Sequence, residues 1–102
     1  MAKQRVLDVL VAYDVSTETK AGRRRLRKVA TACCGFGQRV QNSVFECRVT
    51  PAQLEEMEAR LLDIIEPSED RLRFYELPAN YERAVRVFGL KPDYDLRKPL
   101  IV

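Results

Sequence analysis

Histidine is absent from this chain of 102 residues. Its absence removes imidazole as a metal ligand, as a general base and as the partner of a serine or cysteine nucleophile. Any chemistry must therefore use carboxylates, tyrosine, lysine or arginine.

Cysteines and long apolar runs are also scarce. Cys33 and Cys34 are adjacent and Cys47 stands alone, so the cysteines form neither an even set nor a C-x-x-C pair, and we expect no disulfides and no structural zinc. No apolar run approaches the roughly 18 residues of a membrane span. Near the N-terminus, Asp8 interrupts the apolar core that a signal peptide would need. From the lack of disulfides, of an apolar span and of a signal peptide we expect a cytoplasmic protein that has no membrane association.

Positive charge is concentrated in the first half of the chain. Residues 1–50 hold 10 Lys and Arg against 4 Asp and Glu, whereas residues 51–102 hold 8 against 11. The densest segment has six cations in nine residues with no acid among them: Lys20, Arg23, Arg24, Arg25, Arg27 and Lys28. Such a cluster is typical of a phosphate-binding surface, and the alternative is a solvated helix face.

Hydrophobic periodicity predicts alternating strands and helices. Gly35 and Gly37 should end the first helix and Pro67 the second, and Thr50, Pro51 and Gln53 form the opening of the second helix. The expected elements are strands at 5–13, 39–42 (a short strand or bend), 43–49, 71–77 and 83–88, with helices at 19–34 and 51–65.

This order predicts an α+β fold of the ferredoxin-like type, β-α-β-β-α-β, with an extra C-terminal strand. Both helices should cover one face of an antiparallel sheet in a domain spanning residues 1–89, followed by a tail at 90–102. Because the first strand is apolar on both faces, its second face also needs cover. A second copy of the chain would supply it, so we expect a homodimer through that face, with the strand at 83–88 pairing with the partner's sheet edge.

Asp14 lies at the end of the first strand, directly after Tyr13. A single carboxylate there commonly caps a helix or forms an Asx turn. In a dimer whose axis passes near the first strands, two Asp14 carboxylates would repel each other unless a cation lay between them. Mg²⁺ or Mn²⁺ suits such oxygen ligands and could activate a water for attack on a phosphodiester. Asp8 lies about 20 Å away along the strand and cannot share the ion within one chain.

Three segments resemble a known family. They are VLVAYDVS at 9–16, GQRVQNSVFEC at 37–47 and DRLRFYEL at 70–77, with the basic helix between the first two. Together they resemble the second of the two universal CRISPR-associated adaptation proteins. The resemblance spans residues 5 to about 89, and its most specific part is the core V-Q-x-S-V-F-E.

The resemblance implies a ferredoxin-like homodimer with a divalent metal held by Asp14 of each subunit. It also implies a complex with the integrase-like adaptation protein that inserts short DNA segments into the CRISPR array. Members of the family are often described as magnesium-dependent endonucleases on single-stranded RNA or double-stranded DNA. Nucleic-acid binding is assigned collectively to the basic cluster and one further arginine: Arg23, Arg24, Arg25, Arg27, Lys28 and Arg39.

Two functions remain open. In the first, Asp14 is the catalytic residue and metal ligand of a Mg²⁺- or Mn²⁺-dependent phosphodiesterase. In the second, the dimer is a non-catalytic scaffold that binds duplex DNA for the CRISPR integrase.

Overall fold

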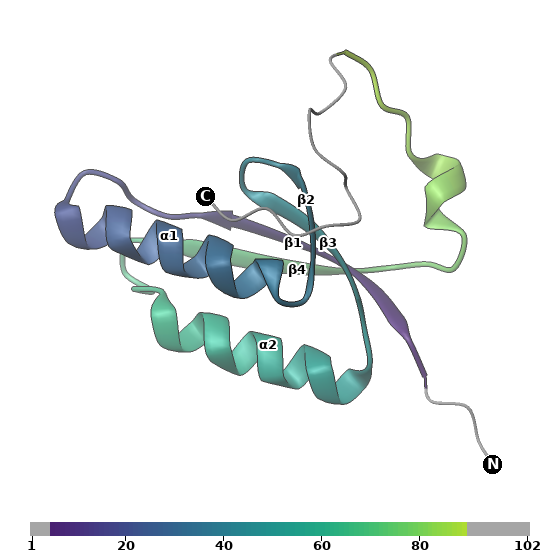
Figure 1. The fold of residues 1–102 in the computed structure, drawn as a ribbon, viewed down its shortest axis with the longest axis horizontal. Helices are drawn as coiled ribbons and strands as arrows, with labels where there is room; N and C mark the ends of the chain where they lie inside the picture. The colour runs from purple at the N-terminus through teal and green to yellow at the C-terminus, as the bar shows by residue number, and fades with distance from the viewer. Residues whose placement is uncertain (1–4, 90–102) are drawn as a thin grey trace.

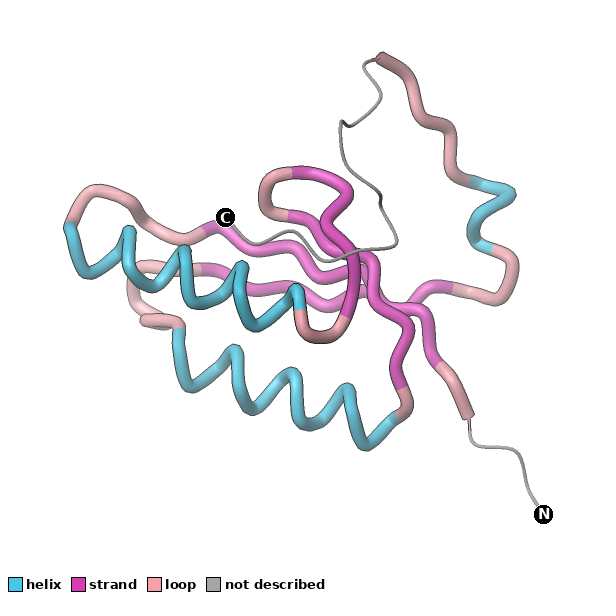
Figure 2. Tube along the Cα trace, in the orientation of Figure 1, coloured by secondary structure: helices cyan, strands magenta, loops and turns pink. Residues whose placement is uncertain are grey.

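Four antiparallel strands form one sheet, and two helices lie side by side on one of its faces (Figures 1 and 2). The computed structural model describes residues 5–89. The strand order in the sheet is β2-β3-β1-β4. The elements are β1 (Leu7–Asp14), α1 (Lys20–Cys34), β2 (Gly37–Gln41), β3 (Val44–Val49), α2 (Pro51–Ile64), β4 (Arg71–Leu77) and a short 3₁₀ helix, η1 (Tyr81–Ala84). The expected α+β class, with helices on one face of an antiparallel sheet, is confirmed.

Local signals determine where the helices begin. The Thr19 hydroxyl accepts a hydrogen bond from the Gly22 N–H at the start of α1. At the start of α2, Thr50 and Gln53 form the predicted reciprocal capping box. An added Cβ at Gly22 would collide with the Ser16 carbonyl, so this glycine lets the first turn of α1 approach the preceding loop. No helix within residues 5–89 is both long and apolar enough to cross a membrane.

The two faces of β1 have different environments. Val9, Val11 and Tyr13 are buried beneath the helices, while the alternate residues point to the opposite face, which we call the open face. In a regular antiparallel register this places Asp8 and Asp14 on the open face. Tyr13 and Asp14, which are adjacent in sequence, therefore lie on opposite faces of the sheet.

The core lies between the sheet and the helices. Phe45 of β3 and Met57 and Leu61 of α2 are its largest fully buried side chains. Phe45 is thus a core residue. Cys33, Cys34 and Cys47 are all buried as well.

One buried carboxylate joins three separate segments. The Asp70 side chain is 0% exposed and accepts the Arg25 Nε at 2.8 Å and the Arg25 Nη2 at 3.3 Å. It also accepts the backbone N–H of Ser16 at 3.1 Å and of Glu66 at 2.8 Å. We call these four contacts the Asp70 network. Burial of the carboxyl acts to raise its pKa, but these hydrogen bonds outweigh burial and hold the pKa of Asp70 below its usual range.

The predicted strand at 83–88 is wrong for the single chain. Residues 81–84 instead form η1, and no strand is assigned between 85 and 89. The prediction fails because a strand requires a hydrogen-bonding neighbour, and residues 83–88 pair with none of the described strands. Val85 has extended backbone angles, and Val87 and Phe88 are highly exposed. Pairing with a partner's edge remains a prediction, and the expected tail at 90–102 lies outside the described residues.

Replacing Asp70 by Asn should destabilise the protein, because Arg25 would lose its charge partner. We expect Tm at pH 7 to fall on the order of 5–10 °C. Because the folded-state pKa of Asp70 is lowered, its stabilising contribution is present above the unfolded pKa, about 3.9, and is lost as pH falls through the folded value. The difference in Tm between wild type and Asp70→Asn should therefore shrink below about pH 4.

Thermal melts followed by circular dichroism between pH 3 and 8 provide this measurement. Asp63→Asn, on the exposed side of α2, is the matched control and should leave Tm nearly unchanged. Equal Tm values for wild type and Asp70→Asn at pH 7 would contradict the role assigned to the network.

The open face predicts self-association. It carries Leu10 and Ala12 of β1 beside Tyr75 of β4, whose side chain is 41% exposed. Leu10→Glu should convert a dimer into a monomer in sedimentation velocity, because it replaces an apolar contact by a second carboxylate directly beside Glu46. Leu62→Glu is the matched control, since Leu62 is 58% exposed on α2, away from the open face. A wild-type monomer at all concentrations, or a dimeric Leu10→Glu variant, would refute the predicted interface.

Candidate nucleic-acid interface

The basic cluster occupies the first two-thirds of α1, where local electrostatics disfavour it. No acidic residue lies in the first turn, although the positive end of a helix dipole favours acids there. Lys20 and Arg24 are four residues apart, as are Arg24 and Lys28, so like charges are neighbours on the helix surface. An ordinary solvated face would intersperse acids among these cations. The arrangement therefore favours an anionic partner over a solvated face.

Two arginines of the cluster make contacts within the fold. Arg25 belongs to the Asp70 network, also lies 3.5 Å from Glu69, and is only 17% exposed. Hydrogen bonds to Asp70 are the main reason that the pKa of Arg25 is raised. Arg23 donates to the Thr17 carbonyl at 3.1 Å. Arg25 thus has a structural role, and its predicted contact with nucleic acid remains untested.

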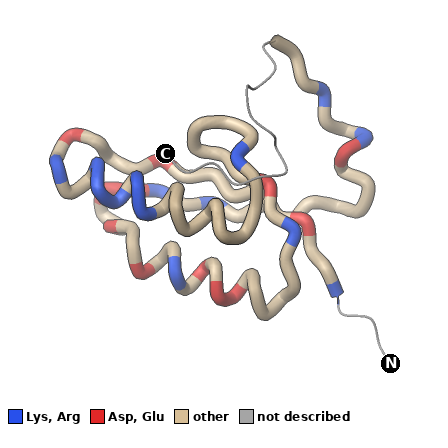
Figure 3. Tube along the Cα trace, viewed as in Figure 1, with Lys and Arg blue, Asp and Glu red and all other residues tan. Residues whose placement is uncertain are grey.

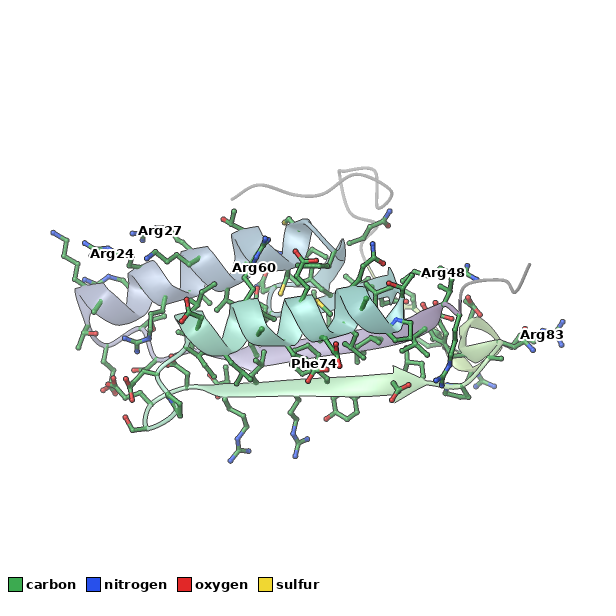
Figure 4. The ribbon with its side chains drawn as sticks, turned by 90° about the horizontal axis from the view of Figure 1, so that it is seen from below. Arg24, Arg27, Arg48, Arg60, Phe74 and Arg83 are labelled. Atoms are coloured by element: carbon green, nitrogen blue, oxygen red, sulfur yellow. The ribbon has the colours of Figure 1, made fainter. Side chains whose placement is uncertain are left out.

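Three of the four remaining cations of the cluster, all except Lys20, line a hollow between the two helices, which we call the interhelical groove. Arg24, Arg27 and Lys28 contribute from α1, and Arg60 contributes from α2. Its volume is about 410 Å³, and Thr31, Ala32 and Ile64 complete its walls. Blue segments mark the cations along α1 and in α2 in Figure 3, and Figure 4 shows Arg24 and Arg27 projecting from α1 on the side away from the sheet.

Arg60 is a groove residue that our sequence analysis missed. Its guanidinium lies 5.5 Å from the centre of the Phe36 ring and 3.7 Å from Glu56. The Phe36 contact orients the side chain, and the exposed pair with Glu56 is weak. In the sequence, Arg60 is an arginine among acidic residues of α2, a pattern that is also typical of an ordinary i,i+4 ion pair. Only the packing of α2 beside α1 distinguishes a groove residue from a member of such a pair.

Arg39 lies apart from the interhelical groove. It stands on β2, with its guanidinium 5.2 Å from the centre of the Phe45 ring. Tyr13 stacks on the same ring at 6.2 Å and donates its hydroxyl to the Asn42 carbonyl at 3.3 Å. Burial raises the pKa of Tyr13, although Arg39 acts to lower it, so the phenol is neutral at physiological pH.

Asp14 is exposed at the end of β1, and it is not the helix cap. Thr19 caps α1, and Asp70 receives the hydrogen bond from the loop, so both common structural roles belong to other residues. None of the residues 5–89 hydrogen bonds to the Asp14 carboxylate or forms an ion pair with it. Its cross-strand neighbour is Arg71 of β4, which sequence analysis did not select.

One chain supplies few ligands for a metal at this position. Within the described part of the chain, no group of three or more His, Cys, Asp or Glu side chains could hold an ion together. Mg²⁺ is commonly held by one or two carboxylates, with water and substrate phosphates completing the octahedron. A free, exposed Asp14 fits that pattern when a second copy or a phosphate adds ligands.

Cysteine chemistry is not available in the core. Burial raises the pKa of the Cys33 thiol to about 12 and that of the Cys47 thiol to about 11. Both thiols are therefore protonated at neutral pH and are poor nucleophiles. This leaves Asp14 as the reactive group best placed for an external ligand.

Reversing charge in the interhelical groove should weaken binding to nucleic acid. We expect Arg27→Glu and Arg60→Glu each to weaken the binding of duplex and single-stranded nucleic acid. The loss of each phosphate contact should also reduce the steepness of a plot of log binding constant against log salt concentration by about 1. Fluorescence anisotropy at several salt concentrations measures both effects. Arg83→Glu is the charge-matched control, because Arg83 lies at the opposite end of the molecule (Figure 4). Equal losses for all three variants would show that net charge, and not the groove, governs binding.

Comparisons with known proteins give one consistent result. The family model described as CRISPR associated protein Cas2 matches residues 8–85. The chain is 55% identical over 94 residues to the CRISPR-associated endoribonuclease Cas2 3 of Rhodospirillum rubrum, a match that covers 92% of this chain and 99% of that protein. It is 50% identical over 93 residues to the CRISPR-associated endonuclease Cas2 of Halalkalibacterium halodurans, covering 91% of this chain and 97% of that one.

A solved structure has the same fold. The crystal structure of Streptococcus pyogenes Cas2 matches with a TM-score of 0.75 and 56% sequence identity, and the match covers 80% of this chain and 99% of that chain. The resemblance inferred from residues 9–16, 37–47 and 70–77 is confirmed by these matches.

Proposed function

The chain belongs to the CRISPR associated protein Cas2 family, and from that premise we propose that it is a nuclease that acts as a homodimer in CRISPR adaptation. The observation that carries the proposal is an exposed carboxylate, Asp14, without a partner among residues 5–89, at the strand end that leads directly into a cationic helix. The endoribonuclease and endonuclease names of its relatives support this activity.

Nucleic acid would be held by its phosphates. The interhelical groove presents four cations from two helices, and among the ion pairs of residues 5–89 only Arg60 of these four has an acidic partner. Phosphate contacts of this type are independent of sequence, which suits a protein that must accept many different segments. Single-stranded RNA and duplex DNA both present the required phosphate spacing.

Asp14 would hold a Mg²⁺ or Mn²⁺ ion together with its counterpart in a second copy. When bound, such an ion neutralises charge on the phosphodiester and lowers the pKa of a bound water. Arg71, directly across from Asp14 on the open face, would position the phosphate by charge-assisted hydrogen bonds. The Asp70 network holds the Ser16 N–H and so sets where β1 ends and where Asp14 stands.

A non-catalytic scaffold is the second candidate. It is favoured by the single carboxylate that each chain offers at this position and by the absence, within residues 5–89, of any larger ligand cluster. In this role the dimer would bind duplex DNA through its cations and bridge copies of the CRISPR integrase.

Asp14→Ala separates the two candidates. If the protein is a nuclease, the variant should lose cleavage of single-stranded RNA or duplex DNA at least roughly 100-fold, the scale of losing stabilisation of transition-state charge. Binding of the same substrates should be retained. Mn²⁺ binding, measured by electron paramagnetic resonance, should be weaker in Asp14→Ala than in wild type. This measurement tests Asp14 as a metal ligand without relying on activity.

Asp8→Ala is the matched control, since Asp8 is a second carboxylate on the same strand and the same face. Cleavage by Asp14→Ala at the wild-type rate, after repurification, would exclude the nuclease centre. Intact spacer acquisition by the same variant in cells would establish the scaffold.

A further inference from the structure

A second hollow lies on the other side of α1 from the interhelical groove. Its volume is about 330 Å³, at the lower end of the range for small-molecule sites. Three elements enclose it: Tyr13 comes from β1, Arg39 from β2, and Leu26, Arg27 and Ala30 from α1, with Asn42 and Ser43 at the β2–β3 turn. None of the interactions described for the Asp14 centre uses it.

The lining has two chemically distinct parts. Leu26 and Ala30 form an apolar wall, and Tyr13 adds an aromatic side chain. Arg27 and Arg39 are the two cationic residues of the lining, and a guanidinium group can bind phosphate in a bidentate manner. A ligand that satisfies both parts has a flat, largely apolar ring and an anionic group attached to it.

Arg39 also has a donor without a partner. Its Nε is buried and makes no hydrogen bond with the described residues. A buried donor without an acceptor is unfavourable, and a small shift of the guanidinium toward a phosphate oxygen in the hollow would satisfy it. The Phe45 ring beneath the guanidinium holds Arg39 in this orientation.

The hollow is connected to the phosphate-binding surface through one residue. Arg27 lines both the interhelical groove and this hollow. A strand whose phosphates follow the groove can therefore place one unpaired nucleotide in the hollow without leaving the cationic surface. Asn42 and Ser43 also line the hollow and provide polar groups for the edge of a base.

We propose that this hollow binds one unpaired nucleotide, with its base against Leu26, Ala30 and Tyr13 and its phosphate on Arg27 and Arg39. We take the physiological ligand to be a nucleotide at the end of a nucleic-acid strand or in a single-stranded segment, and this identification rests on the proposed function. Binding of a free nucleotide does not depend on it.

The test is calorimetric titration of the intact protein with AMP, adenosine and inorganic phosphate. We expect AMP to bind at least tenfold more tightly than either of the other two, because only AMP engages both parts of the lining. Arg39→Met should weaken AMP binding at least tenfold. Arg48→Met, the same substitution on the neighbouring strand β3, should change it less than twofold.

Ala30→Leu tests the cavity itself, because it fills the apolar part and keeps both arginines. It should weaken AMP binding while duplex binding at the interhelical groove is retained. Circular dichroism melts confirm that each variant is folded, and Arg39→Lys replaces Arg39→Met if the latter is not.

Three results would overturn the proposal: AMP binding that Arg39→Met leaves unchanged, phosphate that binds as tightly as AMP, and a loss of AMP and duplex binding together in Arg39→Met. Failure of the proposed function is recognised separately. In that case wild type would bind neither RNA nor duplex DNA, and AMP would still bind in an Arg39-dependent manner.

Discussion

The buried carboxylate of Asp70 is the interaction on which the arrangement of the functional groups depends. Its two oxygens accept four hydrogen bonds, from Arg25, Ser16 and Glu66. These contacts join the loop after β1 and the helix α1 to the turn before β4, whose Asp70 lies 54 positions after Ser16 and 45 after Arg25. The end of β1 carries Asp14, and the start of β4 carries Arg71. A single interaction therefore determines where the candidate metal ligand stands relative to both the sheet and the basic helix.

The two sides of the sheet carry the two proposed kinds of site: phosphate-binding surfaces on one side and the candidate metal ligand on the other. The helical side carries the interhelical groove and the hollow around Arg39, both lined by guanidinium groups. The open face carries Asp14 and Arg71, and Leu10 lies on the same face together with the charged residues Arg73 and Glu46. A phosphate-binding surface functions in one copy, whereas one carboxylate holds a metal better when a second copy adds another. The proposed centre thus requires a dimer, and the proposed binding surfaces do not.

Charge on α1 shows how fold stability and function conflict. Cations near a helix N-terminus oppose the helix dipole and repel one another at spacings of three and four residues. Asp70 and Glu69 compensate Arg25, but the charges of Arg24, Arg27 and Lys28 have no such compensation in the groove. Natural sequences tolerate local conflicts of this kind mainly at functional sites. An anionic polymer would supply the missing counter-charge.

Local chemistry allowed the sequence alone to determine most of the secondary structure, the two helix starts near Thr19 and Thr50, and Asp14 as the strand-end carboxylate. These features depend on periodicity and capping within a few residues. Tertiary structure alone decided that Arg25 pairs with Asp70, 45 positions away, that Arg60 joins the groove, and that Arg71 lies across from Asp14. It also decided that residues 83–88 form no strand in one chain. Each of these depends on which distant segment lies alongside, and a linear pattern carries no information on that neighbour.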